Sequence, residues 1–284
     1  MDTTLDKSLR LKVKLQKFVY ENNFTLKNIS FELFKGEGIA LLGPSGAGKT
    51  TLLKVIDGLY KNYEGEILLD GKEIKNLKPR EIYSIMGLLF QNPEEQLFAE
   101  TVFEDVAFGP RNMGFSEEHI RESVRKALEL VSLSNFENRP LQYLSFGEKK
   151  RVALAGLLAM GHEILLLDEP TLGLDPLLEK NFLELLLNLK KKGYSFVMAT
   201  HNVDLVPYFA DKVVVLKQGE MLFYGSPYDF FVKNDCLEIF NLRPPIPTEI
   251  FKPYQKYLGK LPLTKEEAME VLQKFFKIIF YEAS

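Results

Sequence analysis

The sequence has little that would serve disulfide bonding, secretion or insertion into a membrane. Its 284 residues include one cysteine, Cys236, so no internal disulfide is possible, which is typical of a reducing compartment. The N-terminus, "MDTTLDKSLRLKVKLQ", lacks the apolar core of a signal peptide. Apolar runs such as "VALAGLLAM" and "EILLL" are too short to span a bilayer. Any link to a membrane is therefore expected to come through a partner.

The sequence also lacks an excess of positive charge. A formal net charge of -3 and a pI near 5.8 give no general attraction to nucleic acid. The composition, 46% hydrophobic and 26% charged, is that of an ordinary globular protein. We expect one large domain and one smaller domain, and no nucleic-acid partner.

Hydrophobic periodicity predicts an α/β fold. Residues 10–41 alternate apolar and polar residues, as strands and turns do, and a helix is expected from Lys49 to about Leu59. Residues 63–70 and the following "DG" turn predict a further β unit, whereas residues 92–160 have mostly helical spacing. "HEILLLDEP" and "YSFVMAT" have the continuous apolar runs of buried strands. The proline cluster in "NLRPPIPTE" predicts a linker to a small helical tail.

The segment "GPSGAGKT" matches a phosphate-binding P-loop. It follows the apolar strand "GIALL" and opens the predicted helix "TTLLKVIDGL", which is the context that this motif requires. Backbone N–H groups of such a loop surround phosphates, and the helix N-terminus adds positive potential. Lys49 is expected to reach the β- and γ-phosphates, and the Thr50 hydroxyl to bind Mg²⁺. The alternative is a glycine-rich turn that matches by chance.

Polar side chains follow three other apolar strands. Asp168 and Glu169 end the strand "ILLLDEP", where two adjacent carboxylates are costly to bury without a cation. Asp168 is expected to hold Mg²⁺ and Glu169 to accept a proton from the attacking water. His201 and Gln91 follow apolar runs and are predicted to sense the γ-phosphate and to contact Mg²⁺ or the water. Taken alone, a histidine at such a position could equally be a packed or surface residue.

These motifs, in this order, resemble the ATP-binding subunits of ABC transporters along residues 1–242. The resemblance includes the P-loop, a Q-loop at Gln91, the signature motif in "LSFGEKKRVALAG", the acidic motif "ILLLDEPTLGLD" and a switch histidine at His201. It implies a P-loop NTPase fold: a RecA-like core sheet, an antiparallel β subdomain, a helical signature subdomain at about residues 92–162 and a C-terminal helical extension. We expect an ATPase domain at 1–242 and an extension used for dimerisation at 243–284.

The resemblance also implies how ATP and Mg²⁺ are bound. Such ATPases form head-to-tail dimers, in which the P-loop of one subunit and the signature motif of the other enclose each ATP. ATP then contacts both halves only in the closed state, which couples its binding to closure. Tyr20 stands where the family stacks an aromatic ring on adenine. The implied nucleotide-binding residues are Tyr20, Gly43, Pro44, Ser45, Gly46, Ala47, Gly48, Lys49, Thr50, Thr51, Ser145, Gly147 and Asp175; the implied magnesium ligands are Thr50, Gln91 and Asp168; and the implied catalytic residues are Glu169, His201 and Gln91.

A narrower resemblance is to the energy-coupling factor group, which includes importers of vitamins and of cobalt or nickel. It is carried by "FQNPEEQLFAETVFEDVAFGPRNMGFSEEHI" and by the C-terminal tail. This resemblance implies a peripheral protein on the cytoplasmic face of the cell membrane, with an integral membrane coupling subunit and a substrate-binding membrane subunit as partners. Glu94, Glu95 and Glu100 beside Leu97 and Phe98 would suit a basic, amphipathic coupling helix, although a solvated acidic loop is the alternative.

The signature motif departs from the usual L-S-G-G-Q of the family. Phe146 replaces a glycine and Glu148 replaces the glutamine, which adds bulk and negative charge near a phosphate. Ser145 and Glu148 also match an S-x-x-E capping box. We therefore expect an asymmetric dimer with a second, non-identical ATPase subunit. The alternatives are a soluble ABC ATPase of DNA repair or translation, a binding-only regulatory subunit, and a P-loop kinase, in which the signature motif and the switch histidine would have no role.

Overall fold

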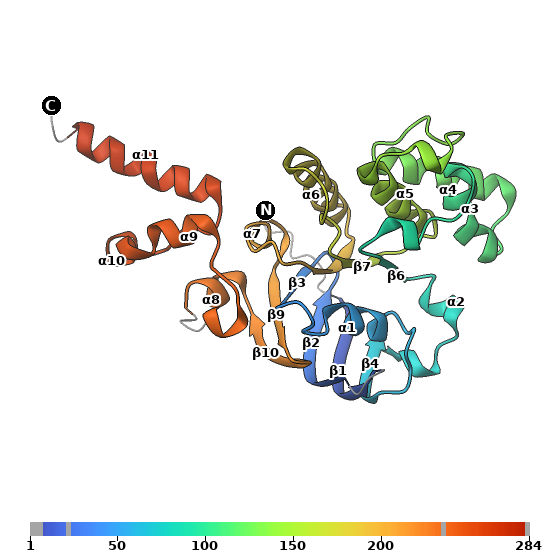
Figure 1. Ribbon diagram of the computed structural model, residues 1–284, viewed down its shortest axis with the longest axis horizontal. Helices are drawn as coiled ribbons and strands as arrows, with labels where there is room; N and C mark the ends of the chain where they lie inside the picture. The colour runs from blue at the N-terminus through green and yellow to red at the C-terminus, as the bar shows by residue number, and fades with distance from the viewer. Residues whose placement is uncertain (1–7, 21–23, 234–236, 282–284) are drawn as a thin grey trace.

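The computed structural model describes residues 8–20, 24–233 and 237–281, so Cys236 lies outside the described residues. Figure 1 shows a sheet-centred body, a group of helices on one side and a C-terminal arm on the other. The described strands form one ten-stranded sheet in the order β5-β4-β1-β2-β10-β9-β3-β8-β7-β6. No helix in the described part of the chain is both long and apolar enough to cross a membrane.

Five strands on one side of this sheet are parallel to one another. They are β3 (Gly38–Leu42), β6 (Met86–Leu89), β7 (Ile164–Asp168), β8 (Ser195–Ala199) and β9 (Lys212–Lys217). All residues of β3, β7 and β8 are buried, which is why these segments are continuous apolar runs instead of alternating ones. Successive residues of β3 enter two different hydrophobic clusters, with Ala40 on one face and Leu41 on the other. Because parallel strands end at a common edge, the residues that follow them can meet there.

The remaining strands lie at the other side of the sheet, where neighbours are antiparallel except that β10 pairs with β2 in parallel. They are β1 (Leu9–Val19), β2 (Thr25–Phe34), β4 (Glu64–Leu69), β5 (Lys72–Glu73) and β10 (Glu220–Gly225). Asp70 and Gly71, at φ 47° and 79°, connect β4 to β5 and confirm the predicted "DG" turn.

The helical insertion consists of α3 (Val102–Asn112), α4 (Glu117–Leu130) and α5 (Phe146–Ala159). Each helix begins after a hydroxyl residue whose oxygen accepts a backbone N–H, namely Thr101, Ser116 and Ser145. Figure 1 shows this group of helices to one side of β6 and β7. We call it the helical subdomain.

Other helices cover the sheet or join its strands. They are α1 (Lys49–Ile56), α2 (Pro79–Ile82), α6 (Pro176–Lys191), α7 (Val206–Phe209) and α8 (Pro227–Phe231), with short 3-10 turns at Ile74–Asn76, Pro93–Glu95, Leu141–Tyr143, Leu237–Phe240 and Lys252–Tyr254. Helix α1 ends three residues before the predicted Leu59, because Gly58 turns the chain at φ 80°.

The C-terminal arm consists of α9 (Ile246–Phe251), α10 (Gln255–Leu258) and α11 (Lys265–Tyr281). It leaves the body beside α8 and extends away from it (Figure 1). The segment predicted as a linker is attached to the body, because the Asp204 carboxylate accepts hydrogen bonds from the Arg243 guanidinium and, at 2.7 Å, from the Ile246 N–H. The division into an ATPase domain and an extension at residue 243 remains a prediction.

Candidate functional site

The P-loop forms the floor of a cavity of about 800 Å³ at the carboxyl edge of the parallel strands. Gly43 and Gly48 have φ values of 144° and 101°, which favour glycine. A Cβ on Gly43 would lie 2.2 Å from the Leu216 carbonyl oxygen, and one on Gly48 would lie 2.9 Å from the Phe24 ring. The loop is therefore packed against Phe24, just before β2, and against β9, and its residues line the cavity together with the start of α1.

Lys49 sits at the centre of this loop. Its ammonium donates hydrogen bonds to the carbonyl oxygens of Gly43, at 2.8 Å, and Pro44, at 3.3 Å, and lies 4.0 Å from the Glu169 carboxylate. Burial lowers the pKa of Lys49, while the negative charges of Glu169 and Asp168 oppose that shift. The lysine is positioned to exchange its carbonyl partners for phosphate oxygens.

Asp168, at the end of β7, faces the P-loop. Its Oδ2 accepts a 2.7 Å hydrogen bond from the Thr50 hydroxyl, whereas Oδ1 is buried and has no hydrogen-bond partner among the described residues. Burial raises the pKa of Asp168, as does the Glu169 charge; the Thr50 hydroxyl and the Lys49 charge lower it. A buried carboxylate oxygen without a donor, beside a threonine hydroxyl, is the kind of oxygen pair that Mg²⁺ binds. The residues therefore fit the predicted magnesium site.

The Glu169 carboxylate lies between Lys49 and His201. Its Oε2 lies 2.8 Å from Nδ1 of His201, and its Oε1 is the carboxylate atom near Lys49. The His201 side chain is 61% exposed, so it faces the open side of the cavity. This arrangement places a carboxylate between a cation and an imidazole, where it can accept a proton from a water molecule.

The structure brings most of the predicted site residues into this one cavity. Its lining includes Tyr20, the loop from Gly43 to Thr51, Gln91, Asp168, Glu169 and His201. It also includes four residues that the sequence analysis missed, namely Phe24, Leu172, Asn241 and Leu242. The place of Phe24 in the cavity could have been predicted from the sequence, since it is an aromatic residue just before β2 and close to Tyr20. No local sequence pattern predicts Asn241 and Leu242, because they reach the site from a distant part of the chain.

The signature segment, residues 144–148, does not line this cavity. Ser145, Gly147 and Asp175 are likewise absent from the described residues that line it. Phe146 lines a neighbouring cavity of about 600 Å³ that also contains Thr50, Gln91 and Asp168. Asp175 caps α6, because its Oδ1 accepts hydrogen bonds from the N–H groups of Leu177 and Leu178, both at 2.9 Å. The nucleotide-binding roles predicted for these residues stay predictions.

The start of α5 forms the expected capping box. Oε2 of Glu148 accepts hydrogen bonds from the Ser145 N–H and hydroxyl, both at 2.8 Å, and the Ser145 hydroxyl accepts one from the Glu148 N–H. Burial raises the pKa of Glu148, but the Ser145 hydrogen bonds and nearby arginine charges outweigh burial, so the net shift is downward. An ionised carboxylate thus lies at the N-terminal end of α5.

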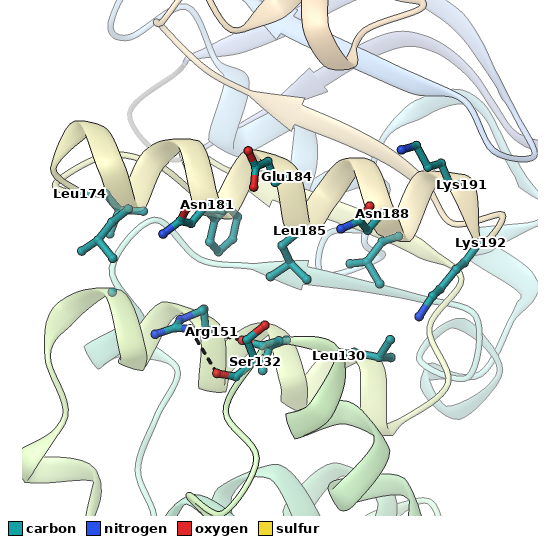
Figure 2. A pocket seen from close by; sticks show the side chains of 15 residues that line it. Leu130, Ser132, Arg151, Leu174, Asn181, Glu184, Leu185, Asn188, Lys191 and Lys192 are labelled. Carbon is teal, nitrogen blue, oxygen red and sulfur yellow. Dashed lines mark hydrogen bonds between the residues drawn. The ribbon is translucent and has the colours of Figure 1, made fainter.

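A second cleft separates the helical subdomain from α6. Figure 2 shows Leu174, Asn181, Leu185 and Asn188 on α6 and its preceding loop, opposite Arg151 on α5. Its volume is about 660 Å³. None of the described residues that line it also lines the P-loop cavity, and we take it to be the space between two subdomains.

Comparison with known proteins identifies the family. The family model described as "ABC transporter" matches residues 26–172. A putative ABC transporter ATP-binding protein from Geobacter sulfurreducens is 45% identical over 93% of this chain and 99% of its own. The energy-coupling factor transporter ATP-binding protein EcfA of Methanocaldococcus jannaschii is 48% identical over 78% of this chain and 80% of its own. The solved structure of cbiO1 from Clostridium perfringens, part of the ABC transporter complex cbiONQ, has a TM-score of 0.74 and 35% identity, with coverage of 88% of this chain and 100% of that chain.

The chain therefore belongs to the ABC transporter ATP-binding family. It is an ATP-binding, ATP-hydrolysing subunit with a P-loop NTPase fold, and the predicted recognition, fold and enzyme class are confirmed.

Proposed function

We propose that this chain powers an energy-coupling factor type importer, as one half of a head-to-tail ATPase dimer attached to membrane subunits. The observation that carries this proposal is the identity of 48% to an EcfA protein together with the likeness to cbiO1. The transported compound would be chosen by a separate membrane subunit. The geometry of the P-loop cavity supports the following division of roles among its residues.

The P-loop and Lys49 would hold the phosphates, while Tyr20 and Phe24 would line the adenine end of the cavity. Thr50, Asp168 and Gln91 would hold Mg²⁺, which neutralises charge on the β- and γ-phosphate oxygens when it is bound. Glu169 would accept a proton from the water that attacks the γ-phosphorus in line with the departing ADP. His201, hydrogen-bonded to Glu169, would orient that carboxylate.

Glu169→Gln tests this assignment. We expect it to reduce ATP turnover by roughly 100-fold or more while ATP binding is retained, because the amide keeps the shape of the side chain but cannot accept the proton. Phosphate release and binding of a fluorescent ATP analogue would be measured on the same preparation. An unchanged rate would exclude Glu169 as the general base.

The proposed dimer is asymmetric. In this chain the P-loop, Asp168, Glu169 and His201 are all in place, whereas Phe146 and Glu148 add bulk and an ionised carboxylate to the signature segment. The ATP site that uses this chain's P-loop would hydrolyse well, and the site completed by its signature segment would hydrolyse poorly. Glu169→Gln in this chain should therefore remove more activity than the matching change in the partner ATPase. Equal losses would contradict the asymmetry.

The surface proposed for the membrane subunit lies beside α3. Phe98 is 65% exposed and packs edge-to-face on Phe108, with ring centroids 4.7 Å apart. Glu94, Glu95 and Glu100, which are close to Phe98 in the sequence, are exposed, and Glu94 pairs with Lys149 at 2.7 Å. An exposed apolar pair with acidic side chains nearby in the sequence would suit the binding of a basic amphipathic helix.

Co-purification of the full chain from detergent-solubilised membranes tests this surface. Wild type should recover a second ATPase and a polytopic subunit, and Phe98→Ser should lose the polytopic subunit only. Leu222→Ser is the matched control, because Leu222 is also an exposed apolar residue, 48% accessible, and lies on β10, away from α3 (Figure 1). Recovery of neither partner by the wild type would contradict the importer assignment.

The C-terminal arm would contribute to the dimer. Along α11, Ala268 and Val271 pack toward the body of the arm, while Met269, Leu272 and Phe275 are exposed by 39–50%. This second apolar face is consistent with the predicted role of the extension in dimerisation.

A further inference from the structure

Lys150 is a buried cation that the proposed mechanism does not use. It lies in the second turn of α5 and is 1% exposed. Its ammonium donates to three carbonyl oxygens, those of Leu172 at 2.7 Å, Pro170 at 2.8 Å and Glu169 at 3.3 Å. An ammonium group has three donors and no acceptor, so these contacts use its whole hydrogen-bonding capacity.

The three acceptors belong to the loop that begins with the proposed general base. Glu169 has a φ of 45°, a left-handed conformation that costs about 1 kcal/mol or more for a residue other than glycine. Such a conformation persists only when its surroundings fix it. The Glu169 N–H donates to the Ala199 carbonyl oxygen at 3.0 Å, and Lys150 binds the Glu169 carbonyl oxygen on the other side. Lys150 thus helps to fix the backbone that directs the Glu169 carboxylate.

The first turn of α5 also packs on this loop and on the start of α6. A Cβ added to Gly173 would lie 3.0 Å from the Phe146 ring, and one added to Gly147 would lie 3.3 Å from Leu178. Beyond these contacts the cleft separates α5 from α6 (Figure 2). The first two turns of α5 and residues 169–178 therefore form a bridge between the helical subdomain and the segment that carries Glu169.

We propose that Lys150 is a positioning residue, which holds Glu169 in its catalytic orientation and makes that orientation depend on the position of the signature helix. This inference rests on the proposed roles of Glu169 as general base and of the signature segment at the second ATP site. A movement of the signature helix at one ATP site would then be transmitted through Lys150 to Glu169, the proposed general base of the other ATP site.

The burial of a charge argues against a purely space-filling role for Lys150. Desolvation lowers the pKa of Lys150 to about 8, opposed by the charge of Glu169. An apolar side chain of similar length would fill the space without this desolvation cost, but it would remove the ammonium donor from the buried Pro170 carbonyl oxygen and the half-buried Leu172 carbonyl oxygen. The Glu169 carbonyl oxygen would keep its 3.1 Å hydrogen bond from the Leu172 N–H but lose the one from Lys150.

The experiment compares Lys150→Met, Lys150→Arg and Lys180→Met in the full-length ATPase with its membrane partners. Lys180 is the matched control, since it lies on α6, is 71% exposed and pairs with Glu184 in the same helix at 3.8 Å. We expect Lys150→Met to lower kcat about tenfold or more with ATP affinity changed less than about threefold, because Lys150 contacts the Glu169 backbone and does not line the P-loop cavity. Lys150→Arg, which keeps the donors, should recover part of the rate, and Lys180→Met should match wild type. Lys150→Gln replaces the methionine variant if that variant does not fold.

A double-mutant cycle separates positioning from a general structural defect. If Lys150 acts through Glu169, Lys150→Met should lower the residual rate of Glu169→Gln by less than about twofold. A further loss as large as that seen in the wild-type background, or a wild-type kcat for Lys150→Met, would overturn the inference alone. A wild-type complex without ATPase activity would overturn the proposed function, and the inference with it.

Discussion

Asp57 offers a direct test of how burial controls the stability of this fold. It follows the last residue of α1, its side chain is 5% exposed, and its Oδ1 has no hydrogen-bond partner among the described residues. Desolvation raises the pKa of Asp57 from 3.8 to about 8. We expect Asp57→Asn, which keeps the shape and removes the ionisable group, to stabilise the protein at neutral pH.

The size and sign of this effect follow from proton linkage. Because the pKa of Asp57 is higher in the folded state, the contribution of this group to the free energy of unfolding is largest below pH 3.8 and falls as the pH rises toward 8. Each pH unit within that interval removes about 1.4 kcal/mol, so the wild type would lose roughly 4 kcal/mol between pH 3.8 and 7. This is an upper bound, since water that enters beside the carboxylate would reduce it. The asparagine variant does not have this loss.

Urea unfolding at pH 5.5 and pH 7.5 measures the effect. The advantage of Asp57→Asn over wild type should be larger at pH 7.5 by about 2–3 kcal/mol, with equal m-values. Glu129→Gln, which removes an exposed carboxylate on α4, is the control and should show no such difference between the two pH values. An equal effect of Asp57→Asn at both pH values, or a destabilisation at both, would refute the reasoning.

Three further predictions concern other parts of the chain. Burial lowers the pKa of His162 to about 4, so the contribution of this group to stability is complete above pH 6.5 and is lost as the pH falls through 4. Lowering the pH from 6.5 to 4 should therefore reduce the free energy of unfolding of the wild type by about 3 kcal/mol more than that of His162→Gln. Combining Phe146→Gly with Glu148→Gln should raise the steady-state phosphate release of the complex severalfold, and an unchanged rate would contradict the proposed weakness of this signature segment. Asp204→Ala, which removes the contacts of Arg243 and the first turn of α9, should make the C-terminal arm more sensitive to limited proteolysis without changing ATP affinity.

The nucleotide cavity could be predicted from the sequence because its chemistry lies in short local motifs. The P-loop was recognisable from its glycines, its lysine and the flanking strand and helix, and Asp168 and Glu169 from an apolar strand that ends in two acids. Parallel strands end at a common edge, so residues from four separate segments were expected to meet, and the structure brings them together.

The contacts that support the site could not be predicted in this way. Lys150 belongs to a run of three basic residues, "KKR", and nothing in that pattern distinguishes the buried lysine from its neighbours. Its ammonium binds three backbone carbonyl groups about twenty residues further along the chain, in the loop that begins at the left-handed Glu169. Asn241 and Leu242 reach the cavity because the chain returns after α8, which is a property of the tertiary fold and not of local spacing.

The capping box gives a physical reason to expect unequal ATP sites. In the structure the Ser145 hydroxyl donates its proton to Glu148, so it has none to offer to a phosphate. To bind the γ-phosphate, Ser145 must break this hydrogen bond, and the ionised Glu148 must tolerate a second anion beside it. A glutamine at the same position would bring no charge and could itself donate a hydrogen bond to the anion. In the proposed dimer, Glu148 would therefore weaken phosphate binding at the signature segment. Its capping hydrogen bonds at the same time stabilise the start of α5, the helix that carries Lys150. Helix α5 would then bind weakly to the ATP held by the P-loop of the partner subunit, while it positions Glu169, the proposed general base of this chain.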